Sequence, residues 1–161
     1  MNFIGNVLII VVLALLTFTV PGYSQTNFSG TWNLKEKQHI KGPEYANGAP
    51  AAFSVEQSKD SIVITYPENN SRVSFALDGK ATSNIGAQSG RKVVRSLKWS
   101  ADKKTVTFTS DIYKAGNENE IELTRIDAWS LSPDGKQLNF HRNSVETITE
   151  SWEVKGVYGK E

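Results

Sequence analysis

The sequence predicts an all-β fold, a single antiparallel up-and-down β-barrel of about 8 to 10 strands. Three observations lead to this prediction. Short runs rich in Val, Ile, Thr, Phe and Trp follow one another from residue 28 to the end of the chain. Turn-forming clusters separate these runs at intervals of about 8 to 12 residues. No segment after residue 25 has a sustained helical period.

Each run between two turn clusters is an expected strand. Asp78-Gly79 and Asp134-Gly135 are strong hairpin signals, because glycine accepts the positive φ that a tight turn requires. The expected strands cover residues 28–36, 52–58, 61–66, 71–77, 81–85, 91–99, 105–113, 120–130, 137–143 and 146–158. Residues 35–51 form the longest expected connection, a surface loop with some packing of its own.

Two of the hairpins resemble each other. KWSADKKTVTF (98–108) and AWSLSPDGKQLNF (128–140) share the order aromatic, Ser, acidic turn, Lys, apolar, Phe. A solenoid or propeller needs at least about three stacked units. Two copies therefore predict two similar hairpins in one meander.

The N-terminal segment predicts export. Residues 1–24 carry no charged side chain, and residues 7–20 are an apolar run of the length typical of a signal peptide. Pro21 and Gly22 end this run, and Gly22-Tyr23-Ser24 fits a cleavage site. We expect a signal peptide over residues 1–24, a barrel domain over residues 25–161, and a periplasmic or extracellular location without stable membrane insertion. The alternative is an uncleaved anchor, because no Lys or Arg precedes the apolar run.

Composition narrows the function classes. The chain has 161 residues, of which 39% are hydrophobic, and a net charge of +1 from 18 basic and 17 acidic residues. This suits one domain and gives no electrostatic reason to expect nucleic acid. There is no cysteine, so disulfides, thiolate zinc sites and thiol nucleophiles are excluded. No catalytic motif or metal-ligand spacing occurs, and we expect no catalytic residue, metal or cofactor.

The stretch FSGTWNL (28–34), with LDGK, the two similar hairpins and a terminal VYGK, resembles the lipocalin-like (calycin) β-barrel family, including exported bacterial members. Its Gly-x-Trp opening is also similar to that of fatty-acid-binding proteins. The resemblance implies a barrel that binds a small hydrophobic ligand. It implies that Trp32 plugs the closed end and that Gly30 lets another backbone approach. An arginine on the last strand often packs on this tryptophan in the family, and Lys155 is the nearest cation here.

Strand alternation places charged side chains on faces that are otherwise apolar. Arg95 alternates with Val93, Leu97 and Trp99. Arg125 shares a face with Ile121, Leu123, Asp127 and Trp129, and Arg142 shares one with Leu138 and Phe140. The last expected strand aligns Ile148, Glu150, Trp152 and Val154. The sequence therefore predicts three arginines inside the barrel.

Burying an unpaired guanidinium is costly, and three arrangements would avoid that cost. Arg95 or Arg125 could pair with Asp127 or Glu150. A bulge could turn the arginines outward. In the third arrangement an acidic ligand is bound. The ligand-binding residues would then be Arg95, Arg125, Arg142 and Tyr158 around the head group, with Phe75, Phe108, Trp129 and Phe140 around an apolar tail.

Three functions follow from these alternatives. The first is a carrier of a small hydrophobic ligand, including an acidic lipid, and it predicts a lumen of about 300 Å³ or more with convergent polar groups. The second is a non-enzymatic structural or interaction barrel with a filled core, whose protein partner the sequence does not identify. The third is a hydrolase or isomerase, which would need His39 or His141 beside a carboxylate in a cleft.

Overall fold

The computed structural model describes residues 24–44, 48–86 and 89–161. The predicted signal peptide, apart from Ser24, lies outside the described residues. Within the described ranges, no helix has the length and apolar character needed to cross a membrane.

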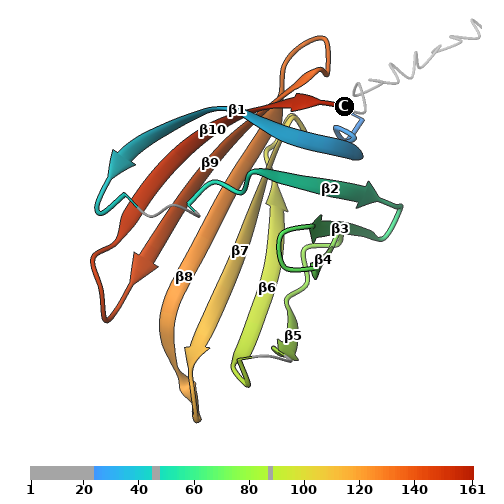
Figure 1. Ribbon diagram of the computed structural model, residues 1–161. Coiled ribbons are helices and arrows are strands. Elements are labelled where there is room, and N and C mark those ends of the chain that lie inside the picture. The colour runs from blue at the N-terminus through green and yellow to red at the C-terminus, as the bar shows by residue number, and fades with distance from the viewer. Residues whose placement is uncertain (1–23, 45–47, 87–88) are drawn as a thin grey trace, which may run out of the picture.

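Ten strands form one antiparallel sheet that curls into a barrel (Figure 1). The strands are β1 (Gly30–Lys41), β2 (Ala52–Gln57), β3 (Ser61–Tyr66), β4 (Ser71–Ala76), β5 (Thr82–Ile85), β6 (Lys92–Trp99), β7 (Thr105–Lys114), β8 (Asn117–Leu131), β9 (Gln137–Glu146) and β10 (Trp152–Lys160). Their order is β4-β3-β2-β1-β10-β9-β8-β7-β6-β5, so the first and last strands pair. The expected antiparallel up-and-down barrel is confirmed.

The barrel has one unsealed seam, between β4 and β5. In the described part of the chain β4 pairs with β3 and β5 pairs with β6, but no ladder joins β4 to β5. The turn between them lies against β6, because a Cβ atom added to Gly79 would be 3.2 Å from the carbonyl oxygen of Leu97. The wall is therefore continuous except along this seam.

Aromatic side chains close the end of the barrel where the chain enters β1 and leaves β10. Trp32 is fully buried, and its indole Nε1 donates a hydrogen bond to the carbonyl oxygen of Phe28 at 2.9 Å. Phe28 is also fully buried, with ring centroids 6.0 Å from Trp99 and 6.1 Å from Trp129. Phe28 precedes β1, so the segment leading into the barrel helps to close it.

Gly30 provides space for a lysine side chain. Its φ is +142°, and an added Cβ would lie 2.6 Å from Cε of Lys160. The Nζ atom of Lys160 lies 5.4 Å from the centroid of the Trp32 ring. The cation over this tryptophan is thus Lys160 and not the expected Lys155, because the register pairs Lys160 with Trp32 and Lys155 with Gln38. Gly30 accommodates a side chain here, whereas the resemblance implied a second backbone.

The two similar hairpins share one turn geometry. Ser100 Oγ donates to Asp102 Oδ1 at 2.6 Å, and Ser132 Oγ donates to Asp134 Oδ1 at 2.6 Å. In both turns the same aspartate oxygen accepts a backbone N–H two residues later, at 3.1 Å. The repeated sequence order therefore corresponds to a repeated structure.

The first strand is longer than expected. β1 continues to Lys41, which shortens the expected connection of residues 35–51. The polar run after Leu34 still pairs with β10, with register shifts between Leu34 and Glu36 and between His39 and Lys41. Residues 48–50, at the end of the connection, are buried and not on the surface.

The expected last strand, residues 146–158, is divided by a turn. β9 ends at Glu146, and β10 begins only after a turn in which Ser151 Oγ accepts a hydrogen bond from the Glu146 N–H at 3.1 Å. Ile148 and Glu150, expected on the inner face, lie in this turn and are exposed. Glu150 therefore does not enter the barrel, and the expectation that it could pair with a buried arginine is wrong.

Inward-facing side chains of β6 to β9 form rows across the wall. From the closed end toward the open end, the pairing gives the rows Trp99-Val106-Trp129-Phe140, Leu97-Phe108-Asp127-Arg142 and Arg95-Ser110-Arg125-Ser144. The apolar row lies deepest and the polar row lies nearest the open end. The closed end of the barrel is therefore filled by apolar side chains, and the charged side chains lie toward the open end.

Candidate functional site

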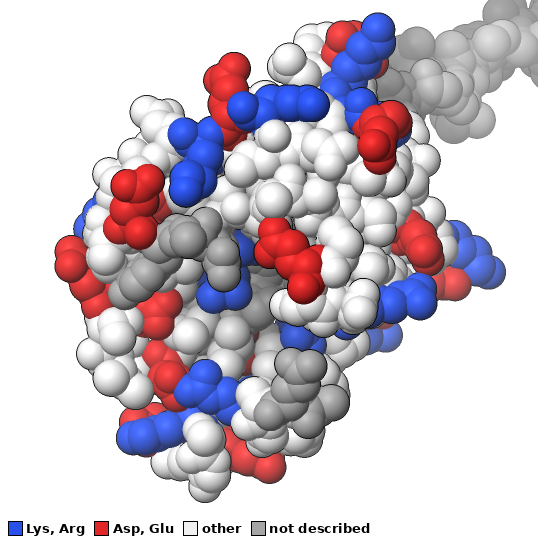
Figure 2. Space-filling view, viewed as in Figure 1, with Lys and Arg blue, Asp and Glu red and all other residues white. Residues whose placement is uncertain are grey.

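A cavity of about 280 Å³ lies inside the barrel. Its wall comes from β3, β4, β6, β7, β8 and β9, on both sides of the seam. The inward-facing residues around it are Ile64, Tyr66, Val73, Phe75, Val93, Arg95, Ser110, Ile112, Arg125, Asp127 and Arg142. Exposed Glu68 and Asn69 of the β3–β4 turn lie at its edge. Figure 2 shows that this face of the molecule is hollowed near its middle and that basic side chains lie in the hollow.

Two arginines and a serine form one row of this cavity. Ser110 on β7 pairs with Arg95 on β6 and with Arg125 on β8. Neighbouring strands are about 4.8 Å apart, so the two arginine backbones are separated by roughly 10 Å. All three residues line the cavity. The row therefore offers two guanidinium groups and a hydroxyl group to one small volume.

Neither of these arginines has a carboxylate within ion-pair distance among the residues that the structure describes. Arg95 Nη1 donates to the neutral side-chain oxygen of Asn84. Arg125 Cζ lies 5.9 Å from the ring centroid of Trp152, and its buried Nε has no hydrogen-bond partner within the described ranges. Burial lowers the pKa of both guanidiniums, and the charge of Arg142 lowers the pKa of Arg125 further. The charges of Asp127 and Glu146 act in the opposite direction on the pKa of Arg125, so two cations face the cavity without an ion pair and with only partial compensation.

Arg142, in contrast, is neutralised by Asp127. Its Nε and Nη2 donate to the two carboxylate oxygens at 2.6 Å each, and both residues are buried. Burial alone would lower the pKa of Arg142, but the charge and hydrogen bonds of Asp127 raise it above its usual value. Internal pairing is therefore present, but at Arg142 and not at Arg95 or Arg125.

Tyr158 and Arg142 hold the buried end of the β1–β2 connection. The Tyr158 hydroxyl donates to the carbonyl oxygen of Pro50 at 2.8 Å, and Arg142 Nη1 donates to that of Gly48 at 3.3 Å. Tyr158 is fully buried, which raises its pKa, and it lies outside the wall of the cavity. Its hydroxyl is thus already engaged by the protein.

The four aromatic side chains expected around a ligand tail lie at two levels. Phe75 lines the cavity, while Phe108, Trp129 and Phe140 are at most 3% exposed. The Phe108 ring lies 4.7 Å from both Phe75 and Trp129, and Phe140 lies 6.3 Å from Trp129. The closed half of the barrel is therefore filled by side chains, and the hollow part lies toward the open end.

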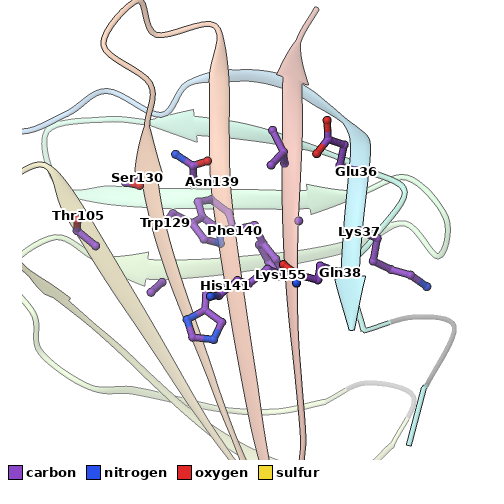
Figure 3. A pocket seen from close by; sticks show the side chains of 13 residues that line it. Glu36, Lys37, Gln38, Thr105, Trp129, Ser130, Asn139, Phe140, His141 and Lys155 are labelled. Carbon is purple, nitrogen blue, oxygen red and sulfur yellow. The ribbon is translucent and has the colours of Figure 1, made fainter. Parts of the chain in front are cut away.

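A second hollow, of about 490 Å³, lies on the outer face of β8, β9, β10 and β1 (Figure 3). Exposed Asn139 and Lys155 border it, and so does His141, whose Nε2 lies 2.7 Å from Glu153 Oε1. This pairing satisfies one condition of the catalytic alternative, but on the side of the wall opposite the cavity. The charged residues described around the outer hollow are exposed, so none of them is an uncompensated buried charge. The inner cavity is therefore the stronger candidate despite its smaller volume.

Strand alternation brought Arg95, Arg125 and Arg142 to the inner face, as the sequence predicts, but it did not identify Ser110. The signal was available, because Ser110 follows Val106 and Phe108 at the two-residue spacing of one strand face. A serine on a half-buried strand has no distinctive pattern. Only the pairing of β7 with both neighbours shows that it lies between two arginines.

A comparison with models of known protein families finds no model that matches this chain, and a comparison with curated proteins finds no matching sequence. The ten-stranded up-and-down barrel is consistent with a calycin-like fold.

Proposed function

We propose that this protein binds a small hydrophobic ligand with an acidic group inside the barrel. The observation that supports it best is Arg125, a largely buried guanidinium that faces a cavity and has no carboxylate partner among the described residues. A buried charge of this kind is costly unless it is paired. An anion bound in the cavity would supply the missing partner through charge-assisted hydrogen bonds.

The composition of the wall supports the same proposal. Arg95 and Ser110 stand beside Arg125, whereas Ile64 and Val73 line the cavity from β3 and β4. Binding sites for small molecules are mostly apolar, with a few polar groups that orient the ligand. A ligand with one acidic end and an apolar body matches this division.

In this proposal the protein is a lipocalin-like carrier and not an enzyme. It acts in the periplasm or outside the cell after removal of residues 1–24, and its ligands include acidic lipids. Two arginines beside a serine hydroxyl are suited to holding an anion, and no histidine lies among the described residues that line the cavity to activate that hydroxyl as a nucleophile.

The filled half of the barrel favours a second candidate function. Because Trp129, Phe108 and Phe140 pack against one another, much of the lumen is ordinary core. A structural or protein-interaction barrel would have such a core and would use its outer faces. This candidate does not account for two cations that face the cavity without an ion pair among the described residues.

The test compares octanoate with octanol, which lacks the charge, by isothermal titration calorimetry. We expect octanoate to bind and Arg125→Met to weaken its binding by roughly 10- to 100-fold, the effect of losing a hydrogen bond to a charged group. Octanol should bind weakly and with similar affinity to both proteins.

Arg72→Met is the matched control, because Arg72 is 62% exposed on the outer face of β4 and pairs with Glu56. It should leave octanoate affinity unchanged. If octanoate does not bind, or if Arg125→Met and Arg72→Met bind it equally well, the carrier proposal is wrong and the interaction barrel becomes the better candidate.

A further inference from the structure

The size and floor of the cavity limit the kind of acid that can enter. We propose that the ligand is a compact carboxylic acid of roughly a dozen non-hydrogen atoms, an aryl or medium-chain acid and not a long-chain lipid. This inference rests on the proposed function and specifies its ligand class. It follows from the volume of the cavity and from what lies beneath it.

The volume sets an upper limit on the buried part of the ligand. At the packing density of protein interiors, a cavity of about 280 Å³ accommodates on the order of 200 Å³ of ligand atoms. That corresponds to roughly a dozen non-hydrogen atoms. It is smaller than the cavities of about 300 to 1,000 Å³ that hold drug-sized ligands.

The floor of the cavity does not open toward the closed end. It includes Phe75, whose ring lies 4.7 Å from that of Phe108, and the buried pair of Arg142 and Asp127. The next row toward the closed end contains Trp129, which is fully buried. A longer tail could extend downward only by separating the Arg142–Asp127 pair or by displacing packed aromatic rings.

The charged end of the ligand has a defined place. The row of Arg95, Ser110 and Arg125 lies one row closer to the open end than Asp127. An acid bound to this row would turn its apolar part toward Val73, Phe75 and Ile64 in the remaining volume. Atoms beyond that volume would project through the opening or the seam into water, where they gain no burial.

Affinity should therefore depend on chain length only over a limited range. The experiment titrates the whole barrel domain with straight-chain carboxylates from butanoate to tetradecanoate, below their micelle concentrations, by calorimetry. We expect the dissociation constant to fall roughly fourfold per added methylene, the value for complete burial. The gain should stop near decanoate, and benzoate and naphthoate should bind according to size.

Phe75→Ala provides a second measurement, because it enlarges the floor of the cavity. In a folded variant we expect the plateau to move to longer acids while butanoate affinity changes little. Arg72→Met, on the outer face of the same strand, should keep the plateau of the unmodified protein.

The possible results separate the two proposals. A plateau near decanoate that shifts in Phe75→Ala supports a compact ligand. Affinity that continues to rise through tetradecanoate in the unmodified protein overturns the compact ligand and leaves the carrier function in place. Failure of every acid in the series to bind overturns the carrier function itself.

Discussion

The ammonium group of Lys160 lies 5.4 Å from the centroid of the Trp32 ring, and its side chain reaches that position by crossing Gly30. Gly30, the glycine of the Gly-Thr-Trp stretch, therefore leaves space for the lysine side chain whose ammonium group lies over Trp32. A cation–π interaction of this kind contributes about 0.5 to 1 kcal/mol when the cation is exposed, as Lys160 is. It joins the first strand to the last at the closed end of the barrel.

Gly30→Ala should destabilise the protein by about 1 to 3 kcal/mol, chiefly because φ is +142°; the new methyl group would also displace the flexible end of the Lys160 side chain. Urea denaturation measures the loss. Gly116→Ala is the matched control, since Gly116 also has a positive φ but no atom lies within 4 Å of its added Cβ. If both variants lose the same stability, contact with Lys160 has no effect.

Asp127→Asn should destabilise the protein by about 3 to 5 kcal/mol, because it leaves the buried guanidinium of Arg142 without its counter-charge. Glu56→Gln breaks the exposed pair with Arg72 and should cost at most about 1 kcal/mol. Urea denaturation of the two variants at neutral pH measures both losses of stability. Similar losses in the two variants would contradict the role of the Asp127–Arg142 pair.

The protein should lose stability at alkaline pH through Tyr158. Burial raises the pKa of Tyr158 in the folded state above its ordinary value of 10.0. As the pH rises past that value, the unfolded chain releases this proton while the folded protein retains it, so the free energy of unfolding falls. Below it, this contribution to stability is fully present.

Tyr158→Phe isolates this effect. The variant should be less stable at neutral pH by about 1 to 3 kcal/mol, because the buried carbonyl oxygen of Pro50 loses its donor. Its stability should nevertheless decline less between pH values of about 9 and 11 than that of the unmodified protein. Thermal unfolding at neutral pH and across this range measures both effects. If the two proteins lose stability in parallel, the pKa of Tyr158 does not differ between the folded and the unfolded state.

Exchanging lysine and glycine at the equivalent position of the two similar turns should change the stability of the protein in opposite directions. Lys103 has φ of 58°, and Gly135 has φ of 69° at the corresponding position of the second turn. A residue with a side chain is strained in this region by about 1 to 2 kcal/mol. Lys103→Gly should therefore stabilise the protein by up to about 1 kcal/mol, and Gly135→Lys should destabilise it by a similar amount.

Melting temperatures of these two variants test this prediction directly. Lys103→Ala serves as the control, because it removes the charge while keeping a Cβ atom in the strained backbone. It should not reproduce the stabilisation. If Lys103→Ala and Lys103→Gly behave alike, the lysine charge is responsible and the backbone conformation is not.

Local patterns in the sequence identified the sheet and the inner face. Arg95, Arg125 and Arg142 could be placed inside because alternation along a strand depends only on neighbouring residues. The partner of Asp127 could not be identified, because it depends on the register between β8 and β9. The same limit applies to Ser110 and to the position of Lys160 over Trp32, since each contact joins residues far apart or on different strands.

The predicted strand boundaries were wrong at two places where the local sequence pattern favours a different structure from the one observed. Ile148 lies in a stretch of β-forming residues without Gly or Pro, yet the chain turns there, because Ser151 satisfies the Glu146 N–H. Conversely, the polar run from Lys35 to Lys41 has no apolar alternation but pairs with β10. At the first place a side chain five residues away caps the end of the strand, and at the second place pairing with a distant strand outweighs local preference.

The ten strands form an open strip and not a closed ring, because β4 and β5 are the two edge strands of the sheet. Separating β4 from β5 would break no inter-strand ladder, whereas opening a fully laddered cylinder must break one. Val73 lies on β4, on one side of the seam, and Arg95 lies on β6, the strand that pairs with β5 on the other side; both line the cavity. Along this one line, in the part of the chain that the structure describes, no backbone ladder joins the two sides of the cavity wall.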